Sequence, residues 1–315
     1  MYIASCPLRV SLFGGSTDSP EFINKYNYGA VINLTCNLKT YITLHQDLIG
    51  YNLEGGYYTI NYSKREVVKQ IEEIKNDPVR VVLDHFQVNP LNVSMTSDSY
   101  SQGSGLASSS SYIISLIKAV SMMKGLSMNS IEICKLAFEL EQKFNQFCGY
   151  QDPFGCGIGG FKKIEFEKGS QIKYTFLQPK IFDYYDMHLV FTGVLRNSTM
   201  VLKNVSSNIQ KSLPLLEILE KAYFELINNN FDKFIFLIAQ SWEKKKKTSQ
   251  LIVENKIIKD LDKYFLENES VISHKLCGAG NGGFFLLFSK KDKLKINQRS
   301  VKIMIESNGV SGRFL

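Results

Sequence analysis

Three glycine-rich segments of this 315-residue chain could bring a bound anion close to the backbone. The first comprises Gly103, Ser104, Gly105, Leu106, Ala107, Ser108, Ser109 and Ser110 and leads into a predicted helix over residues 109–124. Free N–H groups and the positive dipole end at a helix N-terminus attract phosphate, and serine hydroxyls can ligate Mg²⁺. The segment lacks the Gly-Lys-Ser/Thr of a Walker A loop. It indicates either a phosphate-binding loop or a flexible serine-rich loop with a serine helix cap.

The other two segments, residues 155–160 and 278–283, both have GxGxxG spacing. A dinucleotide-binding fingerprint of this kind runs into a helix. Here each segment runs into a predicted strand, over 161–167 and 284–288 respectively. Both patterns therefore favour tight turns between packed elements over a dinucleotide site.

Glu141 is a carboxylate on the apolar arc of a helix predicted over about 130–147. At 100° per residue it falls in line with Ala137 and Phe138. A carboxylate there is desolvated unless it is paired or bound to a cation. The pattern leaves a metal ligand, a buried salt bridge and a locally exposed edge open.

Three further polar residues are ambiguous on local grounds. Arg9 lies in an apolar strand predicted over 2–13, where it faces a cleft, a buried acid or solvent. Asp18 ends the sequence Gly-Gly-Ser-Thr-Asp, in which a helix cap or an Asx-turn is the ordinary interpretation. Asp152 precedes Pro153, and an Asp-Pro pair by itself indicates a turn. The histidines at 45, 85, 188 and 274 are isolated and indicate no site.

Taken together, these segments resemble the motifs of the GHMP kinases, named for galactokinase, homoserine kinase, mevalonate kinase and phosphomevalonate kinase. Cys6 to Asp18 is similar to the first motif, Gly103 to Ser111 to the second and Cys277 to Gly283 to the third. The order and wide spacing also match, and the resemblance covers nearly the whole chain. The Gly-Gly-Ser-Thr-Asp form with Gln151-Asp152 is most similar to the sugar kinases, within them to D-glycero-D-manno-heptose 7-phosphate kinases and their relatives.

The resemblance implies a kinase that uses ATP and Mg²⁺. Residues 103–110 would wrap the ATP phosphates, and Ser109 and Glu141 would hold Mg²⁺. Asp152 would accept the proton of the attacking sugar hydroxyl. Arg9 would keep Asp152 ionised and stabilise the transferring phosphoryl group.

On the acceptor side, the resemblance implies roles for Asp18, Gly15, Ser16 and Gly280. The predicted acceptor is the anomeric hydroxyl of a sugar or sugar phosphate, such as a heptose 7-phosphate. A galactokinase- or fucokinase-like hexose 1-kinase and a catalytically silent sugar/ATP-binding sensor are the alternatives. Trp242 with Lys245 or Lys246 resembles a Trp-x-x-Lys-Lys feature of the heptose kinase group, to which the sequence assigns no role.

The chain departs from the family pattern at several positions. Ser101-Gln102 stand where a proline usually precedes the second motif, and Pro153 replaces the usual glutamine after the catalytic aspartate. Asn281 interrupts the last glycine run, and the stretch from Glu141 to Asp152 is about one residue short. These departures bear on the acceptor more than on the kinase chemistry.

The elements that must position these residues form an α+β pattern with no strict βαβ period. Hairpins are predicted over 29–62 with breaks at Gly50 and Gly55, a helix over 64–87, a strand over 91–95 and a glycine-rich loop over 149–160. The second half is predicted as a strand over 187–194, helices over about 198–265, strands over 271–276 and 284–288, a helix and a short strand. The resemblance implies two domains, 1–170 similar to ribosomal protein S5 domain 2 and 171–315 ferredoxin-like, with the active site between them.

The composition restricts the classes of molecule that the chain is expected to bind. A net charge of +7 favours anionic ligands but selects none of them. A nucleic-acid module is disfavoured because basic and aromatic positions do not interleave, and no apolar run approaches the ~18 residues that cross a bilayer. The 6 cysteines form no CxxC or zinc pattern, and no secretory leader is predicted. We therefore expect a cytoplasmic monomer or homodimer with reduced thiols and no nucleic-acid or membrane partner.

Overall fold

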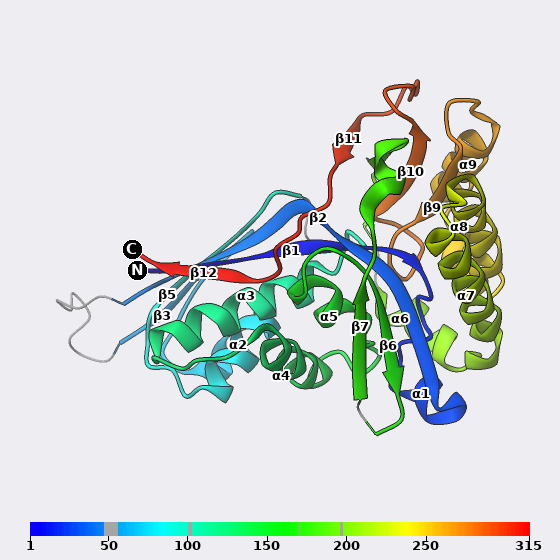
Figure 1. The fold of residues 1–315 in the computed structure, drawn as a ribbon. Helices are drawn as coiled ribbons and strands as arrows, with labels where there is room; N and C mark the ends of the chain where they lie inside the picture. The colour runs from blue at the N-terminus through cyan, green and yellow to red at the C-terminus, as the bar shows by residue number, and fades with distance from the viewer. Residues whose placement is uncertain (47–55, 100–102, 170, 196–197) are drawn as a thin grey trace.

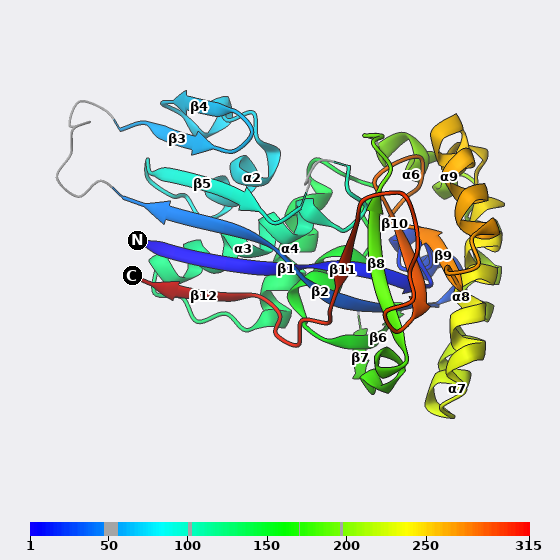
Figure 2. The ribbon, with the colours of Figure 1, turned by 90° about the horizontal axis from the view of Figure 1, so that it is seen from above.

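Two long N-terminal strands run through the whole molecule in the computed structural model, which describes residues 1–46, 56–99, 103–169, 171–195 and 198–315 (Figures 1 and 2). Strand β1 (Tyr2–Phe13) pairs antiparallel with β2 (Tyr28–His45) from Tyr2 opposite Leu44 to Phe13 opposite Ile32. Their side chains are mostly buried, because both faces of these strands are covered along much of their length.

The first sheet is completed on both sides of this pair. The second half of β2 is followed by β5 (Asn92–Ser97), β3 (Tyr58–Asn61) and β4 (Arg65–Val68), and its first half pairs with β6, to which β7 is joined. Strand β6 spans Phe161–Glu167 and β7 spans Gln171–Phe176. The C-terminal strand β12 (Ser311–Phe314) returns to pair with β1, so the two chain ends lie side by side (Figure 1).

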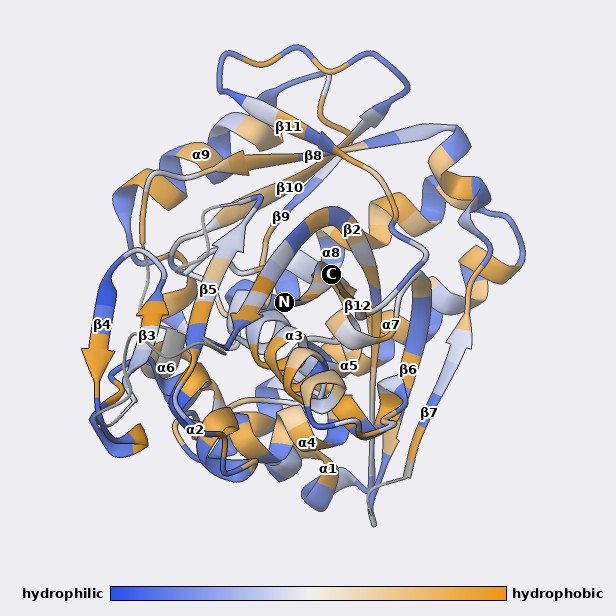
Figure 3. Ribbon diagram, turned by 90° about the vertical axis from the view of Figure 1, so that its left-hand side faces the viewer, coloured by the Kyte–Doolittle hydropathy of each residue, from blue (hydrophilic) through white to orange (hydrophobic). Residues whose placement is uncertain are grey.

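A group of helices covers one face of this sheet: α2 (Asp77–His85), α3 (Ser108–Met123), α4 (Ser130–Gln142) and α5 (Gln151–Gly157), with α1 (Pro20–Tyr26) nearby. The apolar residues of α3, orange in Figure 3, pack against β1, β2 and α4. Gly125 ends α3 with a φ of 68°, as the sequence predicts. The short helix η1 (Ile71–Glu73) precedes α2.

The second sheet has the order β11-β8-β10-β9, which is fourth-first-third-second along the chain. Its strands are β8 (Tyr185–Phe191), β9 (Ser273–Leu276), β10 (Phe284–Lys290) and β11 (Ser300–Ile303). The remaining helices are α6 (Ser198–Ser206), α7 (Leu213–Ile227), α8 (Phe231–Lys246) and α9 (Lys256–Glu267), with short helices η2 (Pro179–Asp183), η3 (Ile209–Ser212) and η4 (Gln250–Val253). This strand order is ferredoxin-like, and the α+β two-sheet architecture confirms the predicted fold class.

One hydrophobic core joins the two sheets. Leu8 and Leu34 of the first sheet pack in the same cluster as Leu219 of α7, Phe234 of α8 and Leu286 of β10. Strands β7 and β12 also belong to the first sheet although they follow residue 170. The division into residues 1–170 and 171–315 therefore stays a prediction. Pairing crosses this boundary at β7, at β12 and at the isolated bridge between Cys36 and Ile305.

Several predicted elements were wrong. Residues 65–68 of the predicted helix over 64–87 form strand β4, because the β-branched Val67 and Val68 pair with β3. The helix over 130–147 ends at Gln142, and the loop predicted over 149–160 contains α5. Residues 291–299 form no helix, since their backbone turns at Asp292, whose N–H donates to Asp186.

Gly50, Gly55, Ser101 and Gln102 lie outside the described residues. None of the described helices is long and apolar enough to cross a membrane.

Candidate active site

A cavity of about 560 Å³ lies where the phosphate-loop segment, α5 and the C-terminal half meet. Most of the predicted site residues line it: Arg9, Gly15, Ser16, Asp18, Gly103, Ser104, Gly105, Ala107, Ser108, Ser109, Glu141 and Asp152. Three predicted residues are not in its wall. Leu106 and Ser110 are buried behind it, and Gly280 packs against Ile252 of η4 while Gly278 and Ala279 face the cavity.

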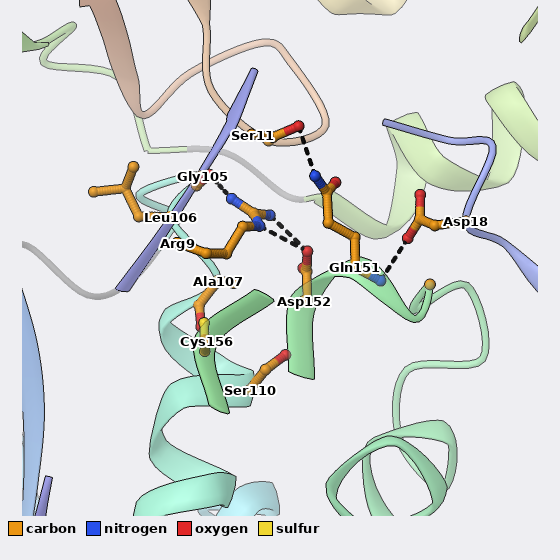
Figure 4. A network of polar contacts seen from close by, with 12 residues as sticks. Arg9, Ser11, Asp18, Gly105, Leu106, Ala107, Ser110, Gln151, Asp152 and Cys156 are labelled. Atoms are coloured by element: carbon orange, nitrogen blue, oxygen red, sulfur yellow. Dashed lines mark hydrogen bonds and ion pairs between the residues drawn. The ribbon is translucent and has the colours of Figure 1, made fainter. Parts of the chain in front are cut away.

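Arg9 and Asp152 form the centre of the site (Figure 4). The Arg9 side chain donates from Nε at 3.0 Å and from Nη2 at 2.6 Å to Oδ1 of Asp152, and from Nη1 at 2.7 Å to the Gly105 carbonyl. Burial acts to lower the pKa of Arg9, but the charge and hydrogen bonds of Asp152 together with the nearby thiols of Cys156 and Cys277 outweigh it, and the pKa is raised. Arg9 is 4% exposed at its side chain and Asp152 34%, so a fixed cation stands behind a carboxylate that opens to the cavity. This arrangement suits a carboxylate that acts as a base within the cavity.

Asp18 holds the start of the helix that carries Asp152. Its carboxylate accepts the backbone N–H of Gln151 at 2.9 Å and that of Ser16 at 3.0 Å. Gln151 in turn donates through Nε2 to the Ser11 hydroxyl at 2.8 Å, as Figure 4 shows. Burial, together with the Asp152 charge, raises the pKa of Asp18 to about 6 against the hydrogen bonds it accepts. Asp152 is therefore placed by its helix, whereas the sequence alone indicated a turn.

The first glycine-rich segment reaches α3 through left-handed backbone. Gly103 has a φ of 67°, Gly105 of 82° and Ala107 of 61°, and Ala107 precedes α3 with no side-chain cap. A Cβ at Gly105 would lie 2.5 Å from the Cys277 carbonyl oxygen, so the glycine lets the first and third segments touch. The Ser104 hydroxyl bonds that of Ser108 at 2.9 Å. Ala107, Ser108 and Ser109 at the start of α3 line the cavity and no side chain caps the helix, which favours the phosphate-loop alternative over the capped-loop one.

Glu141 is buried, being 2% exposed, and its Oε2 accepts the Ser110 hydroxyl at 2.5 Å. Burial raises its pKa to about 7, although hydrogen bonds from Ser110, Cys148 and Ser109 oppose the shift. Within the described ranges, no Lys or Arg forms an ion pair with it, so the salt-bridge alternative is not met.

A buried carboxylate beside exposed Ser109 fits a hard divalent cation. The described part of the chain holds no group of three His, Cys, Asp or Glu side chains that would form a complete protein cage. Hydroxyls, water and phosphate oxygens would therefore supply the remaining ligands. This is how Mg²⁺ usually binds in phosphoryl-transfer sites.

Lys245 and Cys148 are among the cavity residues to which sequence reasoning gave no role. Lys245, on the last turn of α8, lines the wall and donates to the Gly278 carbonyl. Cys148 lines it beside Glu141, and burial first, then the Glu141 charge, raises its pKa well above the usual value. Lys245 belongs to the Trp-x-x-Lys-Lys pattern noted in the sequence. Nothing in the neighbouring residues indicates that its side chain points in a different direction from that of Lys246.

Residues 61–160 match the family described as GHMP kinases N terminal domain. Together with the similar proteins described next, this match supports an ATP-dependent kinase similar to the GHMP kinases.

Three similar proteins illustrate this relationship. D-glycero-alpha-D-manno-heptose 7-phosphate kinase of Campylobacter jejuni is 28% identical over 300 residues, covering 90% of this chain and 87% of that protein. L-fucokinase/L-fucose-1-P guanylyltransferase of Bacteroides fragilis is 24% identical over 94% of this chain, which spans 35% of that longer protein. The crystal structure of a D-glycero-D-manno-heptose 1-phosphate kinase from Bacteroides thetaiotaomicron has a TM-score of 0.76 at 19% identity, over 100% of this chain and 99% of that one, which shows a shared fold.

Proposed function

We propose that this kinase transfers the γ-phosphoryl group of ATP to the anomeric hydroxyl of a sugar, with a heptose 7-phosphate-like acceptor. The observation that carries the proposal is the buried Arg9 behind Asp152, facing the uncapped start of α3 across one cavity. A base, a guanidinium and phosphate-binding N–H groups are what phosphoryl transfer asks of a protein.

In this mechanism, Asp152 accepts the proton of the attacking hydroxyl. Arg9 keeps its two bonds to Oδ1, which fixes the carboxylate and leaves Oδ2 for the acceptor. An anomeric hydroxyl is more acidic than an ordinary alcohol, so a carboxylate is a more adequate base for it. The N–H groups at the start of α3 bind the nucleotide phosphates. Glu141 and Ser109 would hold Mg²⁺, which neutralises phosphate charge when bound.

The acceptor side supports a sugar larger than galactose. A Cβ built at Gly15 has only the Gln151 amide oxygen and the Ser11 hydroxyl near it, each at 3.7 Å, so the glycine leaves room where a side chain would project. The Campylobacter relative named for heptose 7-phosphate supports that acceptor class. Asp18 lines the same part of the cavity, and its carboxylate oxygens are proposed to accept sugar hydroxyls beside the N–H groups they already bind.

The second candidate is a hexose 1-kinase, favoured by the similarity to the Bacteroides fragilis L-fucokinase. A silent sugar/ATP-binding sensor is the third, and the intact Arg9–Asp152 pair and buried Glu141 argue against it.

Phosphorus NMR of the product tests the proposal. Heptose 7-phosphate, heptose, fucose and galactose are each incubated with MgATP, and ADP release is measured in parallel. The expected product is a 1-phosphate whose phosphorus couples to the anomeric proton. A phosphoryl group on any other hydroxyl, or no ADP release with any of these sugars, would refute the proposal.

A further inference from the structure

The four consecutive lysines at the end of α8, Lys244 to Lys247, have different surroundings in the structure. Lys244 and Lys247 are exposed, whereas Lys245 lines the cavity and donates to the Gly278 carbonyl. Lys246 points elsewhere and donates to Asp262 at 2.7 Å. A basic run on a helix is usually solvated throughout, so this division needs a cause.

The cause is a partly buried polar cluster between α8 and α9. Asp262 of α9 accepts the Trp242 indole N–H at 2.6 Å and the Lys246 ammonium at 2.7 Å, and its Oδ1 lies 2.8 Å from His274 Nε2. Trp242 is 1% exposed. Consecutive helix positions differ by about 100°, so Lys245 lies about 60° from Trp242 and about 100° from Lys246 around α8. Anchoring Trp242 and Lys246 to Asp262 therefore fixes the rotation of α8 and directs Lys245 away from Asp262.

The place that Lys245 reaches is where glycine-rich segments from both halves of the chain meet. Gly278 follows Cys277, whose carbonyl lies against Gly105, and the Phe284 N–H donates to the Ser104 carbonyl at 3.1 Å. The wall of this cavity carries several carboxylates, and its guanidinium, Arg9, is bonded to Asp152 and Gly105. An ammonium placed here suits a compact, multiply charged anion.

We propose that Lys245 binds a phosphate group of a ligand held in this cavity. The inference rests on the proposed kinase function and adds an anionic subsite to it. The phosphate has two sources, the terminal phosphate of the nucleotide and a phosphate carried by the acceptor sugar. Both present the same tetrahedral oxyanion to the ammonium.

Calorimetric binding tests this subsite without requiring turnover. Lys245→Met is compared with Lys247→Met, an exposed neighbour of the same run, and with Lys245→Arg, which keeps the charge. Four ligands are titrated: the non-hydrolysable triphosphate AMP-PNP, ADP, heptose 7-phosphate and heptose. Thermal melting of each variant shows whether the fold is kept.

If the nucleotide is the source, Lys245→Met weakens AMP-PNP by roughly 10- to 100-fold more than it weakens ADP. If the acceptor is the source, it weakens heptose 7-phosphate by a similar factor and leaves heptose unchanged. Lys245→Arg retains part of the affinity in either case. A folded Lys245→Met protein that binds all four ligands as Lys247→Met does would overturn the subsite, whereas absent ADP release with wild-type protein would overturn the kinase proposal instead.

Discussion

Lys162 of β6 gives a prediction that depends on burial alone. Its side chain is 0% exposed, and its ammonium donates to the Gly155 carbonyl at 3.1 Å and to the Gly160 carbonyl at 3.3 Å. No carboxylate among the described residues forms an ion pair with Lys162. The ionisable groups near its ammonium are the thiols of Cys6, Cys134 and Cys156. Burial lowers the pKa of Lys162 to about 7 from 10.5, although these thiols oppose the shift.

A lysine whose pKa is lower in the folded than in the unfolded protein makes stability rise with pH. Between about pH 7 and pH 10.5 the unfolded chain binds a proton that the folded chain has released. The free energy of unfolding therefore increases by up to about 1.4 kcal/mol per pH unit in this window. From pH 7 to 8.5, the contribution of Lys162 comes to about 1.5 kcal/mol. Below pH 7 the folded chain is also protonated, and the slope disappears.

Urea unfolding at pH 7.0, 7.5, 8.0 and 8.5 measures this contribution as a difference between wild-type protein and Lys162→Met. Other shifted groups, such as Lys275, whose pKa burial lowers to about 8, are present in both proteins and cancel. The cysteine thiols have raised pKa values in the folded protein and titrate at about pH 8.5 in the unfolded chain, but they too are present in both proteins and cancel in the difference.

The adjacent Lys163 is the control, because its ammonium pairs with Glu220 at 3.0 Å and Glu165 at 3.2 Å. Relative to Lys162→Met, wild-type protein is expected to gain about 1.5 kcal/mol over this range, and Lys163→Met to keep the wild-type slope. Parallel pH profiles for wild-type protein and Lys162→Met would show that burial does not lower the pKa of Lys162, and the reasoning would fail.

Three further predictions concern the active site. Asp152→Asn removes the base and is expected to lower kcat by about 10² to 10⁴ while ATP binding stays nearly unchanged; an Asn variant with most of its activity would make Asp152 a turn residue. MgATP at about 100 times Kd should add roughly 2.7 kcal/mol of stability, and Glu141→Gln should remove the Mg²⁺-dependent part of the shift in melting temperature. If that variant only lowers stability and keeps the metal dependence, Glu141 is structural. Gly105→Ala adds a Cβ 2.5 Å from the Cys277 carbonyl oxygen at a position with a φ of 82°. Its melting temperature should be lower than that of Gly169→Ala, because Gly169 has a similar φ of 92° but no atom within 4 Å of an added Cβ. Equal melting temperatures would refute a tight contact between the two glycine-rich segments.

Much of the element order follows from local patterns. Strand β1 was predicted with its observed ends, and α3 begins one residue before the prediction and ends one residue before it. These elements are fixed by apolar periodicity and by glycines that need left-handed backbone, which are properties of neighbouring residues. The prediction of a helix over 64–87 is confirmed for α2 and failed before it, where β4 forms because its pairing partner β3 lies outside the segment.

The sequence by itself determined which segments could bind phosphate, because glycine and serine content, helix starts and the order of the motifs can be read directly from the chain. Only the tertiary structure decided which residues meet. Arg9 and Asp152 are 143 positions apart, and no local pattern places one on the other. Lys162 and Lys163 alternate across β6, and their directions depend on its pairing with β2, which turns Lys162 toward the Gly155 carbonyl and Lys163 toward Tyr223 of α7. In the same way Lys245 faces the cavity because Asp262, on another helix, holds α8 in one rotation. Side-chain direction is a property of register and packing between distant elements, and that information appears only when the chain is folded.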